Sequence, residues 1–277
     1  MTGSLDAPPE ITRDDFAAIS ALLHQRTGIR LVPGKETLVM GRLSRRLRQL
    51  GIGGYDEYVR LLHHPDGHEL GQAIDLLTTN ETSFFREPQH FDYLRDTVVP
   101  RHPGGRLFRL WSAASSSGEE AYTAAMVLLE RPPQGGFEIY GTDVSTRIVA
   151  GARRGLYPLE ASARIPPELL RKYWLKGRDE YAGLMAAGST LRERVTFLHA
   201  NLLDDLGDLG RFDVILLRNV MIYFDQPTKA ALVQRLQNML HPEGHLIVSL
   251  SETLNGIPSH LRMVRPSIYR LPAGSRD

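Results

Sequence analysis

A run of small residues followed by carboxylates is the first feature of this sequence that could carry chemistry. The segment WSAASSSGEEAYTAAM (111–126) passes from an apolar stretch through serines and a glycine into a helical pattern. A backbone without bulky side chains lets a ligand lie against the carboxyl end of a strand, which is where open α/β sheets bind ligands. The segment contains no GxGxxG pattern, and a strand-to-helix loop can be rich in Ser and Gly without binding anything.

An acidic residue follows the next apolar stretch. Asp143 ends FEIYGTD (137–143), 25 positions after Gly118, and an acid about 20 positions after a glycine-rich turn is how such folds hold the two hydroxyls of a ribose. The alternative is that Asp143 caps the helix beginning near Ser145, and the spacing leaves both interpretations open. No P-loop, HExxH or GxSxG pattern is present. The sequence therefore indicates a nucleoside cofactor bound without a P-loop.

Two further segments place polar and aromatic side chains beside apolar stretches. LLRNVMIYFD (216–225) brings Asn219 and Tyr223 to the end of a predicted strand, although a buried tyrosine with a satisfied hydroxyl is the structural alternative. LLTTNETSFFREPQHF (76–91) is unusually rich in hydrogen-bonding and aromatic groups for a linker.

Composition limits the classes of protein to which this chain can belong. Its 277 residues, 42% hydrophobic and 23% charged, suit one large globular domain or two ordinary ones. No stretch reaches the ~18 apolar residues of a membrane helix, and the start, MTGSLDAPPEITRDD, lacks the apolar centre of a secretion signal. We therefore expect a cytoplasmic protein without membrane insertion. The absence of cysteine excludes disulfides, thiolate metal sites and cysteine nucleophiles, and a net charge of +1 argues against a dedicated nucleic-acid binder.

Apolar periodicity predicts the elements that must position these residues. The first ~80 residues read as helices, one between Thr12 and Gly28 and a second with Met40, Leu43, Leu47 and Leu50 on one face. After Pro100 the pattern changes to alternating strands and helices. The predicted strands are 106–114, 137–143, 195–199, 212–218 and 245–251; the predicted helices are about 119–129, 145–154 and 227–240; and 155–194 is an insertion.

Four ordered motifs make a specific resemblance. TTNETSFFRE, WSAASSSGEEAYTAAM, ANLLDD and RNVMIYFD are similar to the motifs of the CheR family of chemotaxis receptor glutamate methyltransferases. The similarity covers nearly the whole chain and includes MGRLSRRLRQLG and GLYPLEASARIPPELLRKYW. Two positions depart from the family, which often has Cys where this chain has Ser115 and Pro where it has Ala121.

The resemblance implies a fold and a domain organisation. The fold is α/β, a class I (Rossmann-like) methyltransferase domain dependent on S-adenosylmethionine, with a small antiparallel β insertion and an all-α domain before it. The implied parts are a helical substrate-recognition domain at 1–80, a linker at 81–100 contributing to the cofactor site, and the methyltransferase domain at 101–277 with its insertion at about 155–194.

The resemblance also implies O-methylation of glutamate side chains on a chemoreceptor. Arg86 and Tyr223 match the residues that the family is proposed to use in methylation, and a salt bridge to Glu81 or Glu87 is the structural alternative for Arg86. S-adenosylmethionine is the implied cofactor, S-adenosylhomocysteine its product, and no metal is expected. The matching cofactor residues are Asn80, Thr82, Arg86, Glu120, Asp143, Asn201, Leu202, Asn219 and Val220.

A cluster of arginines is the candidate for substrate recognition. No acid occurs between Glu36 and Asp56, so this part of the second helix is strongly positive unless it is simply a solvated face. In the family this region is associated with the methylation helices of the receptor's cytoplasmic bundle, and in some members the insertion adds a receptor's C-terminal peptide as a strand. We expect a monomer. The arginines are Arg42, Arg45, Arg46 and Arg48.

Two other functions fit parts of the sequence. One is a methyltransferase of the same fold acting on a nucleic-acid base, because Asn219 and Tyr223 resemble the Asn/Asp-Pro-Pro-aromatic motif that holds a flipped base; the prolines are missing and the net charge is near zero. The other is a non-catalytic adaptor that binds the cofactor and docks on receptors, against which the presence of Arg86 and Tyr223 argues.

Overall fold

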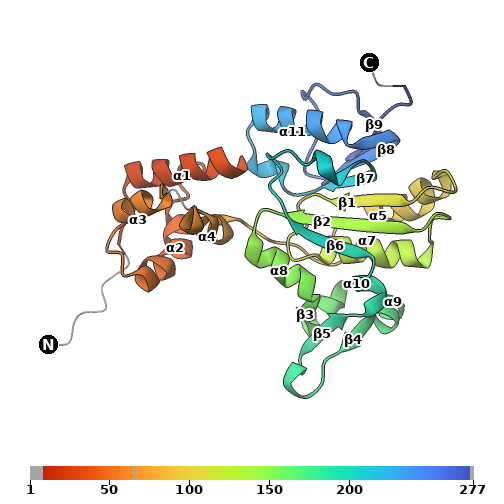
Figure 1. The fold of residues 1–277 in the computed structure, drawn as a ribbon, viewed down its shortest axis with the longest axis horizontal. Coiled ribbons are helices and arrows are strands. Elements are labelled where there is room, and N and C mark those ends of the chain that lie inside the picture. Colours follow the sequence, from red (N-terminus) through yellow and green to blue (C-terminus); the bar gives the residue numbers. More distant parts are fainter. Residues whose placement is uncertain (1–8, 65–66, 275–277) are drawn as a thin grey trace. The chain divides into compact units, whose positions relative to one another are not determined.

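The computed structural model describes residues 9–64 and 67–274, which form two compact units (Figure 1). The helical unit contains the chain up to Thr79 together with Tyr223–Asp225. The methyltransferase unit contains Asn80–Ile222 and the chain from Gln226 onward. Residues 1–8, the first eight of the fifteen in MTGSLDAPPEITRDD, lie outside the described residues, so the structure says nothing of a secretion signal there.

The helical unit follows from its caps and apolar faces. Thr12 accepts a hydrogen bond from the Asp15 amide at the start of the first helix, and Gly28 ends that helix in the left-handed conformation, as predicted. The face predicted for the second helix is wrong at Leu50, which is 38% exposed, while Val39 is fully buried. The helices are α1 (Arg13–Thr27), α2 (Glu36–Leu50), α3 (Tyr55–Leu62) and α4 (His68–Leu77).

The methyltransferase unit is built on a seven-stranded sheet of order β6-β2-β1-β7-β8-β10-β9. The first five strands of this order pair in parallel, and β10 and β9 continue the sheet in antiparallel pairing. Chain order reverses between β1 and β7, so this sheet has a topological switch point there. The strands are β1 (Phe108–Ser112), β2 (Phe137–Asp143), β6 (Val195–His199), β7 (Phe212–Leu217), β8 (Leu240–Val248), β9 (Arg262–Arg265) and β10 (Ile268–Arg270).

Helices cover both faces of this sheet, with α7 and α8 on one face and α11 on the other (Figure 1). Gly118 precedes α7 with φ 98°, and a Cβ there would lie 2.8 Å from the Phe197 ring, so only glycine fits. The sequence predicted Pro227 as the first residue of its helix, but the helix begins one residue earlier, at Gln226, so Pro227 is the second. The helices are α7 (Glu119–Glu130), α8 (Thr146–Arg154), α10 (Ser189–Arg192) and α11 (Gln226–Asn238).

The insertion forms its own three-stranded antiparallel sheet of order β3-β5-β4. Its aromatic side chains pack on the methyltransferase core, where Tyr157 and Trp174 each contact the rings of Phe84 and Tyr122 edge to face. The α/β fold with an antiparallel β insertion and a preceding helical unit is thus confirmed. The elements are β3 (Leu156–Pro158), α9 (Pro167–Tyr173), β4 (Trp174–Lys176) and β5 (Leu184–Ala187).

The segment expected to be a linker, 81–100, instead supplies part of the methyltransferase core. It contains α5 (Gln89–Tyr93), a π-helical turn (Leu94–Val98) and the start of α6 (Val99–Arg101). Its apolar side chains explain the difference, because burying them costs less than exposing them to water. The buried ones are Phe84, Phe91, Tyr93, Leu94, Val98 and Val99.

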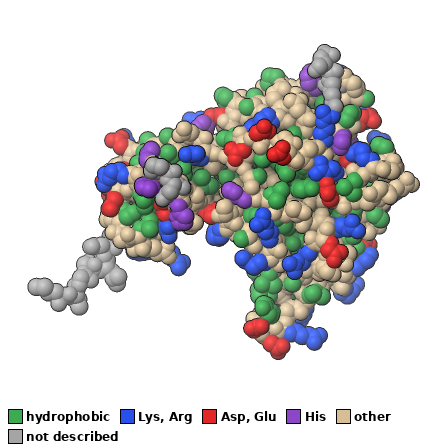
Figure 2. All heavy atoms as spheres, viewed as in Figure 1, with side chains coloured by type: hydrophobic (Ala, Val, Ile, Leu, Met, Phe, Trp, Pro, Cys, Tyr) green, Lys and Arg blue, Asp and Glu red, His purple; other side chains and the backbone are tan. Residues whose placement is uncertain are grey.

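No helix within the described ranges is both long enough and apolar enough to span a bilayer. On the face that Figure 2 shows, basic and acidic side chains of the methyltransferase unit are interspersed. This mixture accords with the net charge of +1.

Candidate functional site

The predicted cofactor residues of the methyltransferase unit follow strands that lie side by side. Asp143 is the last residue of β2, Asn201 follows β6, and Asn219 follows β7. Glu120 lies in the first turn of α7, which follows β1. Because these strands are parallel neighbours, their carboxyl ends meet at one edge of the sheet. The structure therefore brings these four residues to the edge expected to bind a ligand.

Asp143 joins the loops that follow β1 and β2. The residue is 8% exposed. Its carboxylate accepts hydrogen bonds from the backbone amides of Ser116 (2.9 Å) and Ser145 (3.0 Å). The cap of α8 is Ser145, whose hydroxyl accepts from the Ile148 amide, so Asp143 is not the helix cap.

The segment around Asn80 is tied to the same loop. The Ser116 hydroxyl donates to the Asn80 backbone carbonyl at 2.8 Å, and Thr82 lies two residues farther along, half-buried. Two predicted cofactor residues thus belong to a segment held against the β1–α7 loop.

Leu202 is buried and lines a cavity of about 360 Å³ together with Trp111, Leu232 and Leu236. Asn201 accepts a hydrogen bond from the Leu203 amide, which forms a tight side-chain turn. The Arg235 guanidinium donates to the carbonyls of Leu202 (2.7 Å) and Leu203 (2.6 Å). These contacts fix the loop that carries the predicted Asn201–Leu202 pair.

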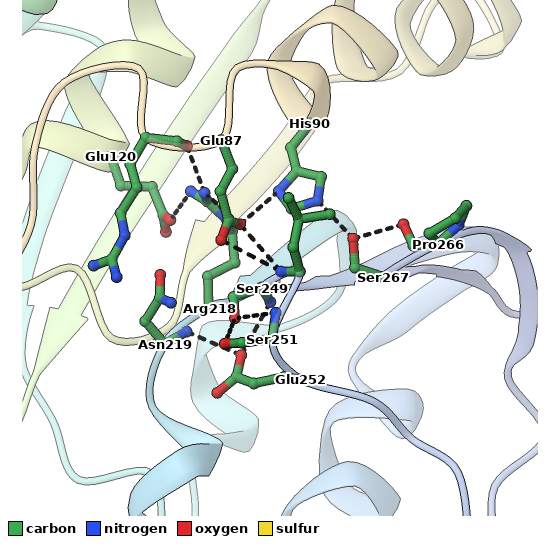
Figure 3. Close-up of polar contacts among 12 residues, drawn as sticks. Glu87, His90, Glu120, Arg218, Asn219, Ser249, Ser251, Glu252, Pro266 and Ser267 are labelled. Atoms are coloured by element: carbon green, nitrogen blue, oxygen red, sulfur yellow. Dashed lines mark hydrogen bonds and ion pairs between the residues drawn. The ribbon is translucent and has the colours of Figure 1, made fainter.

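A buried ion cluster crosses the switch point between β1 and β7 (Figure 3). The Arg218 guanidinium contacts the carboxylates of Glu120 (2.6 Å) and Glu87 (3.0 Å) and donates to the Arg86 carbonyl at 2.5 Å. Ser112 donates to the other Glu120 oxygen at 2.7 Å. The Arg218 side chain is 2% exposed, and a charge so deeply buried requires paired charges.

Four residues at this site have a left-handed backbone without being glycine. Phe85 has φ 51°, Glu87 has φ 56°, Ser116 has φ 48° and Asn219 has φ 57°. This conformation is strained, particularly for a bulky side chain such as phenylalanine, and such strain concentrates at functional sites.

Arg86 lies between two of these strained residues. Its guanidinium donates to the backbone carbonyl of Glu81 at 2.9 Å, while the Glu87 carboxylate pairs with Arg218 instead. The side-chain salt bridge considered as the alternative for Arg86 is therefore replaced by a backbone contact. The side chain is half-buried, which leaves part of it available to a ligand.

Glu252 holds the loop that carries Asn219 and Val220. Its carboxylate accepts from the backbone amides of Asn219 (3.0 Å), Ile222 (3.2 Å) and Ser249 (3.0 Å). These bonds join the ends of β7 and β8 and compensate the left-handed backbone at Asn219.

Tyr223 belongs by its contacts to the helical unit. Its carbonyl accepts from the Arg30 amide at 2.9 Å, and the next residue, Phe224, forms an antiparallel bridge with Ile29. Asp225 pairs with His24 at 3.0 Å. The Tyr223 side chain is half-buried, and its predicted catalytic role stays a prediction.

The four arginines of α2 do not share one environment. Arg42 donates to the carbonyls of Leu77 and Thr78 and to the Thr79 hydroxyl. Arg45 and Arg48 are exposed. Arg42 and Arg46 are therefore held within the helical unit and do not belong to a solvated face, and the contact that holds Arg46 is an ion pair.

Arg46 makes a two-pronged contact with Glu69, whose side chain is 6% exposed. The Tyr58 hydroxyl also donates to Glu69, at 2.7 Å. Burial raises the pKa of Glu69, but the Arg46 guanidinium and the Tyr58 hydroxyl together hold it below its ordinary value. The neutralising acid lies 23 positions from Arg46, beyond the acid-free stretch between Glu36 and Asp56.

Sequence reasoning missed Arg218, Glu87 and Glu252 as parts of the site. The sequence did indicate that Arg218 has a partner. It directly follows the apolar run of β7, whose residues are all buried, and a charged side chain beside a buried strand has to be paired. Its partner Glu87 is 131 positions away. No local pattern reveals a pair of that separation.

The side chains at this edge suit S-adenosylmethionine. Asp143 places a buried carboxylate at this edge. Glu120 and Glu87 share one guanidinium, which leaves one negative charge of the three groups uncompensated. His90, which faces Glu87 at 3.4 Å, does not compensate it, because burial lowers the pKa of His90 to about 4. A cationic ligand fits such a site.

Comparison with known proteins agrees with these features. Residues 80–269 match the CheR methyltransferase SAM-binding domain, and residues 14–78 match the CheR methyltransferase all-alpha domain. Chemotaxis protein methyltransferase 2 of Pseudomonas aeruginosa is 39% identical over 264 residues, covering 93% of each chain. Chemotaxis protein methyltransferase of Escherichia coli is 37% identical over 260 residues, covering 92% of this chain and 90% of that one. The chain belongs to the CheR methyltransferase family.

Proposed function

We propose that this protein transfers the methyl group of S-adenosylmethionine to glutamate side chains on the cytoplasmic helical bundle of a chemoreceptor, giving glutamate methyl esters. The observation that carries the proposal is the match of residues 80–269 to a SAM-binding methyltransferase domain. Its predicted ligands Glu120 and Asp143 lie at the carboxyl ends of the adjacent parallel strands β1 and β2, Glu120 just after β1 and Asp143 as the last residue of β2. The relatives named as chemotaxis protein methyltransferases support a receptor as substrate.

The reaction needs positioning more than proton transfer. A glutamate side chain has a reference pKa near ~4.3, so at neutral pH the nucleophile is already a carboxylate. The bound cofactor supplies an activated methyl group on a positively charged sulfur. What the protein has to do is align the carboxylate oxygen with that methyl group and exclude water.

Individual side chains have assigned tasks in this proposal. Asp143 accepts from the ribose hydroxyls and Glu120 from the cofactor's ammonium group, Arg86 orients the substrate carboxylate, and the Tyr223 hydroxyl donates to it. The remaining predicted cofactor contacts come from Asn80, Thr82, Asn201, Leu202, Asn219 and Val220.

The helical domain is the proposed receptor-recognition part. Arg45 and Arg48, the two exposed arginines of α2, would face acidic residues of the receptor bundle. The edge strands β3 and β4 of the insertion are where a receptor's C-terminal peptide would add as a strand. We place the domain boundary at Thr79–Asn80, with Tyr223–Asp225 contributed to the helical domain.

Methylation with labelled cofactor tests the proposal. The protein is incubated with labelled S-adenosylmethionine and receptor cytoplasmic fragments, and the product is treated with alkali. The expected result is label on the receptor that alkali releases as methanol, because a carboxyl methyl ester hydrolyses. Alkali-stable label would instead indicate a base or amide substrate, and the absence of label despite cofactor binding would indicate an adaptor.

A further inference from the structure

We propose that Arg218 is a positioning residue which, together with Glu87, fixes the strained segment Phe85–Glu87 and thereby orders Arg86 for methyl transfer. The inference rests on the proposed function only for the role of Arg86. The ordering of the segment follows from contacts within the methyltransferase unit. Figure 3 shows those that Arg218 makes with Glu120 and Glu87.

The geometry of the guanidinium is the first reason. One terminal nitrogen binds the Glu120 carboxylate at 2.6 Å, and the other binds both the Arg86 carbonyl at 2.5 Å and the Glu87 carboxylate at 3.0 Å. The guanidinium is planar and rigid, so these acceptors are held at fixed positions relative to one another. The backbone of Arg86 is thus held in register with Glu120, the proposed cofactor ligand.

Backbone strain is the second reason. Phe85 and Glu87 both have a left-handed backbone, which costs roughly 1–3 kcal/mol for a residue other than glycine and persists only where surrounding contacts enforce it. The contacts come from three other elements. The Thr123 hydroxyl accepts a hydrogen bond from the Phe85 amide, and the Leu250 amide lies 3.3 Å from the Glu87 carboxylate. Arg218 donates to the backbone carbonyl of Arg86, the residue between Phe85 and Glu87.

Burial makes the cluster sensitive to single changes. The side chains of Arg218, Glu120 and Glu87 are 2%, 11% and 16% exposed, and Arg218 also lies over the Phe91 ring. Loss of one partner leaves a charge that water cannot reach. Without Arg218, we expect the segment to relax toward an unstrained backbone and Arg86 to lose its fixed direction.

Two variants test the proposal. Arg218→Lys keeps the charge but cannot bind three acceptors in one plane, and Glu87→Gln keeps the shape of its side chain but removes the ion pair. Calorimetry with S-adenosylhomocysteine counts the intact cofactor sites in each preparation, and the methylation kcat is expressed per such site. For each variant we expect this kcat to fall by roughly ten- to a hundredfold, the loss typical of a misplaced group. Glu87→Gln should weaken binding of S-adenosylhomocysteine by a smaller factor than it lowers kcat, because it removes a negative charge from the site but leaves the proposed cofactor ligand Glu120 with its partner.

Arg109→Lys is the matched control. Like Arg218, Arg109 donates both to a carboxylate, that of Glu138 at 2.5 Å, and to backbone carbonyls, those of Leu209 and Arg211. Unlike Arg218, it lies on β1 away from the carboxyl end of that strand. This variant should lower the melting temperature and leave kcat per cofactor site unchanged. Combining Glu87→Gln with Arg218→Lys should lower kcat no further than Arg218→Lys alone, since both act through one segment.

Hydrogen exchange supplies a readout that needs no receptor. Backbone amides of residues 84–91 should exchange faster in Arg218→Lys and in Glu87→Gln than in the parent protein, and at the parent rate in Arg109→Lys. Parent-like exchange together with parent-like kcat per site in Glu87→Gln would overturn the proposal. A parent protein that binds S-adenosylhomocysteine but methylates no receptor would instead overturn the proposed function, and the exchange data would still decide this inference.

Discussion

At the scale of single residues, Asp143 is the proposed ligand of the cofactor's ribose. It also joins two loops, because its carboxylate accepts hydrogen bonds from the backbone amides of Ser116 and Ser145. Asp143→Ala should therefore weaken binding of S-adenosylhomocysteine by about 1.5–3 kcal/mol, the range for hydrogen bonds to charged groups, and should also lower the melting temperature. Calorimetry measures the first effect, with Asp143→Asn as a control that keeps one acceptor oxygen. Unchanged affinity for S-adenosylhomocysteine in a folded Asp143→Ala protein would show that Asp143 only connects the two loops and does not bind the cofactor.

Tyr223 allows chemistry to be separated from cofactor binding, because its proposed partner is the substrate carboxylate. Tyr223→Phe should lower the methylation rate by roughly tenfold, as expected for loss of about 1.4 kcal/mol in the transition state. Its affinity for S-adenosylhomocysteine should stay the same. Single-turnover kinetics with a receptor fragment provide the measurement, and a variant as fast as the parent would exclude an essential role for the hydroxyl.

At the scale of elements, α2 presents two arginines to solvent and uses two others inside the helical unit. Arg45→Glu combined with Arg48→Glu should raise the KM for the receptor and flatten its dependence on salt, since exposed charges act over a screening length of about 8 Å in physiological salt. The melting temperature and cofactor affinity should remain nearly unchanged. Normal receptor methylation by this variant at low salt would make the two arginines an ordinary solvated face.

Arg46→Glu is the contrasting change in the same helix. It breaks the contact with Glu69 and places two carboxylates together. We expect a loss of about 1.5–3 kcal/mol in the free energy of unfolding, because Arg46 is 22% exposed and its partner is buried. Urea denaturation measures the loss. Stability equal to that of the parent would show that the Arg46–Glu69 contact contributes nothing to the fold.

The elements differ in how far the sequence determined them. Strands β2 and β6 agree with the predicted ranges to the residue because each is a compact apolar run with a polar boundary. Strand β8 begins at Leu240, five residues before its predicted start, because His-Pro-Glu-Gly does not read as a strand. Strand β9 was missed because its four residues, Arg-Met-Val-Arg, are all exposed at a sheet edge and show no alternation.

The site was predictable where a motif carries it and unpredictable where it depends on distant partners. The spacing of Asp143 to Gly118 made it a candidate ribose ligand beside the alternative of a helix cap, and Arg86 and Tyr223 became candidates only through the family resemblance. The ion cluster joins residues 87, 120 and 218, and the pairing of Arg46 with Glu69 joins two helices. Long-range pairs of this kind arise from tertiary packing and leave no periodic pattern in the sequence.

At the scale of the whole molecule, two buried histidines predict how stability depends on pH. Burial lowers the pKa values of His90 and His245 to about 4. The unfolded chain, with histidine pKa values near ~6.5, takes up protons that the folded chain does not, so stability falls as the pH is lowered from about 6.5 toward 4. Each histidine contributes a slope of at most ~1.4 kcal/mol per pH unit.

The variant His245→Gln isolates one of these contributions. His245 packs against Tyr93, with the ring nitrogen 3.3 Å from the tyrosine hydroxyl, so the substitution should lower stability at every pH. The further loss between about pH 7 and about pH 5 should nevertheless be smaller than in the parent, because one fewer proton is taken up on unfolding. Denaturant titrations at both pH values measure the difference, and an equal loss in both proteins would show that His245 does not titrate on unfolding.

The measurement that most directly tests the central claim is to locate the transferred methyl group. A receptor cytoplasmic fragment is incubated with the protein and S-adenosylmethionine, digested at mildly acidic pH to preserve esters, and sequenced by tandem mass spectrometry. The account predicts methylation on glutamate side chains of the receptor's helices, roughly tenfold less of it with Tyr223→Phe at a short fixed incubation time and the parent amount with Arg109→Lys. Methyl groups found on lysine, arginine or a chain terminus, with glutamates unmodified, would contradict it.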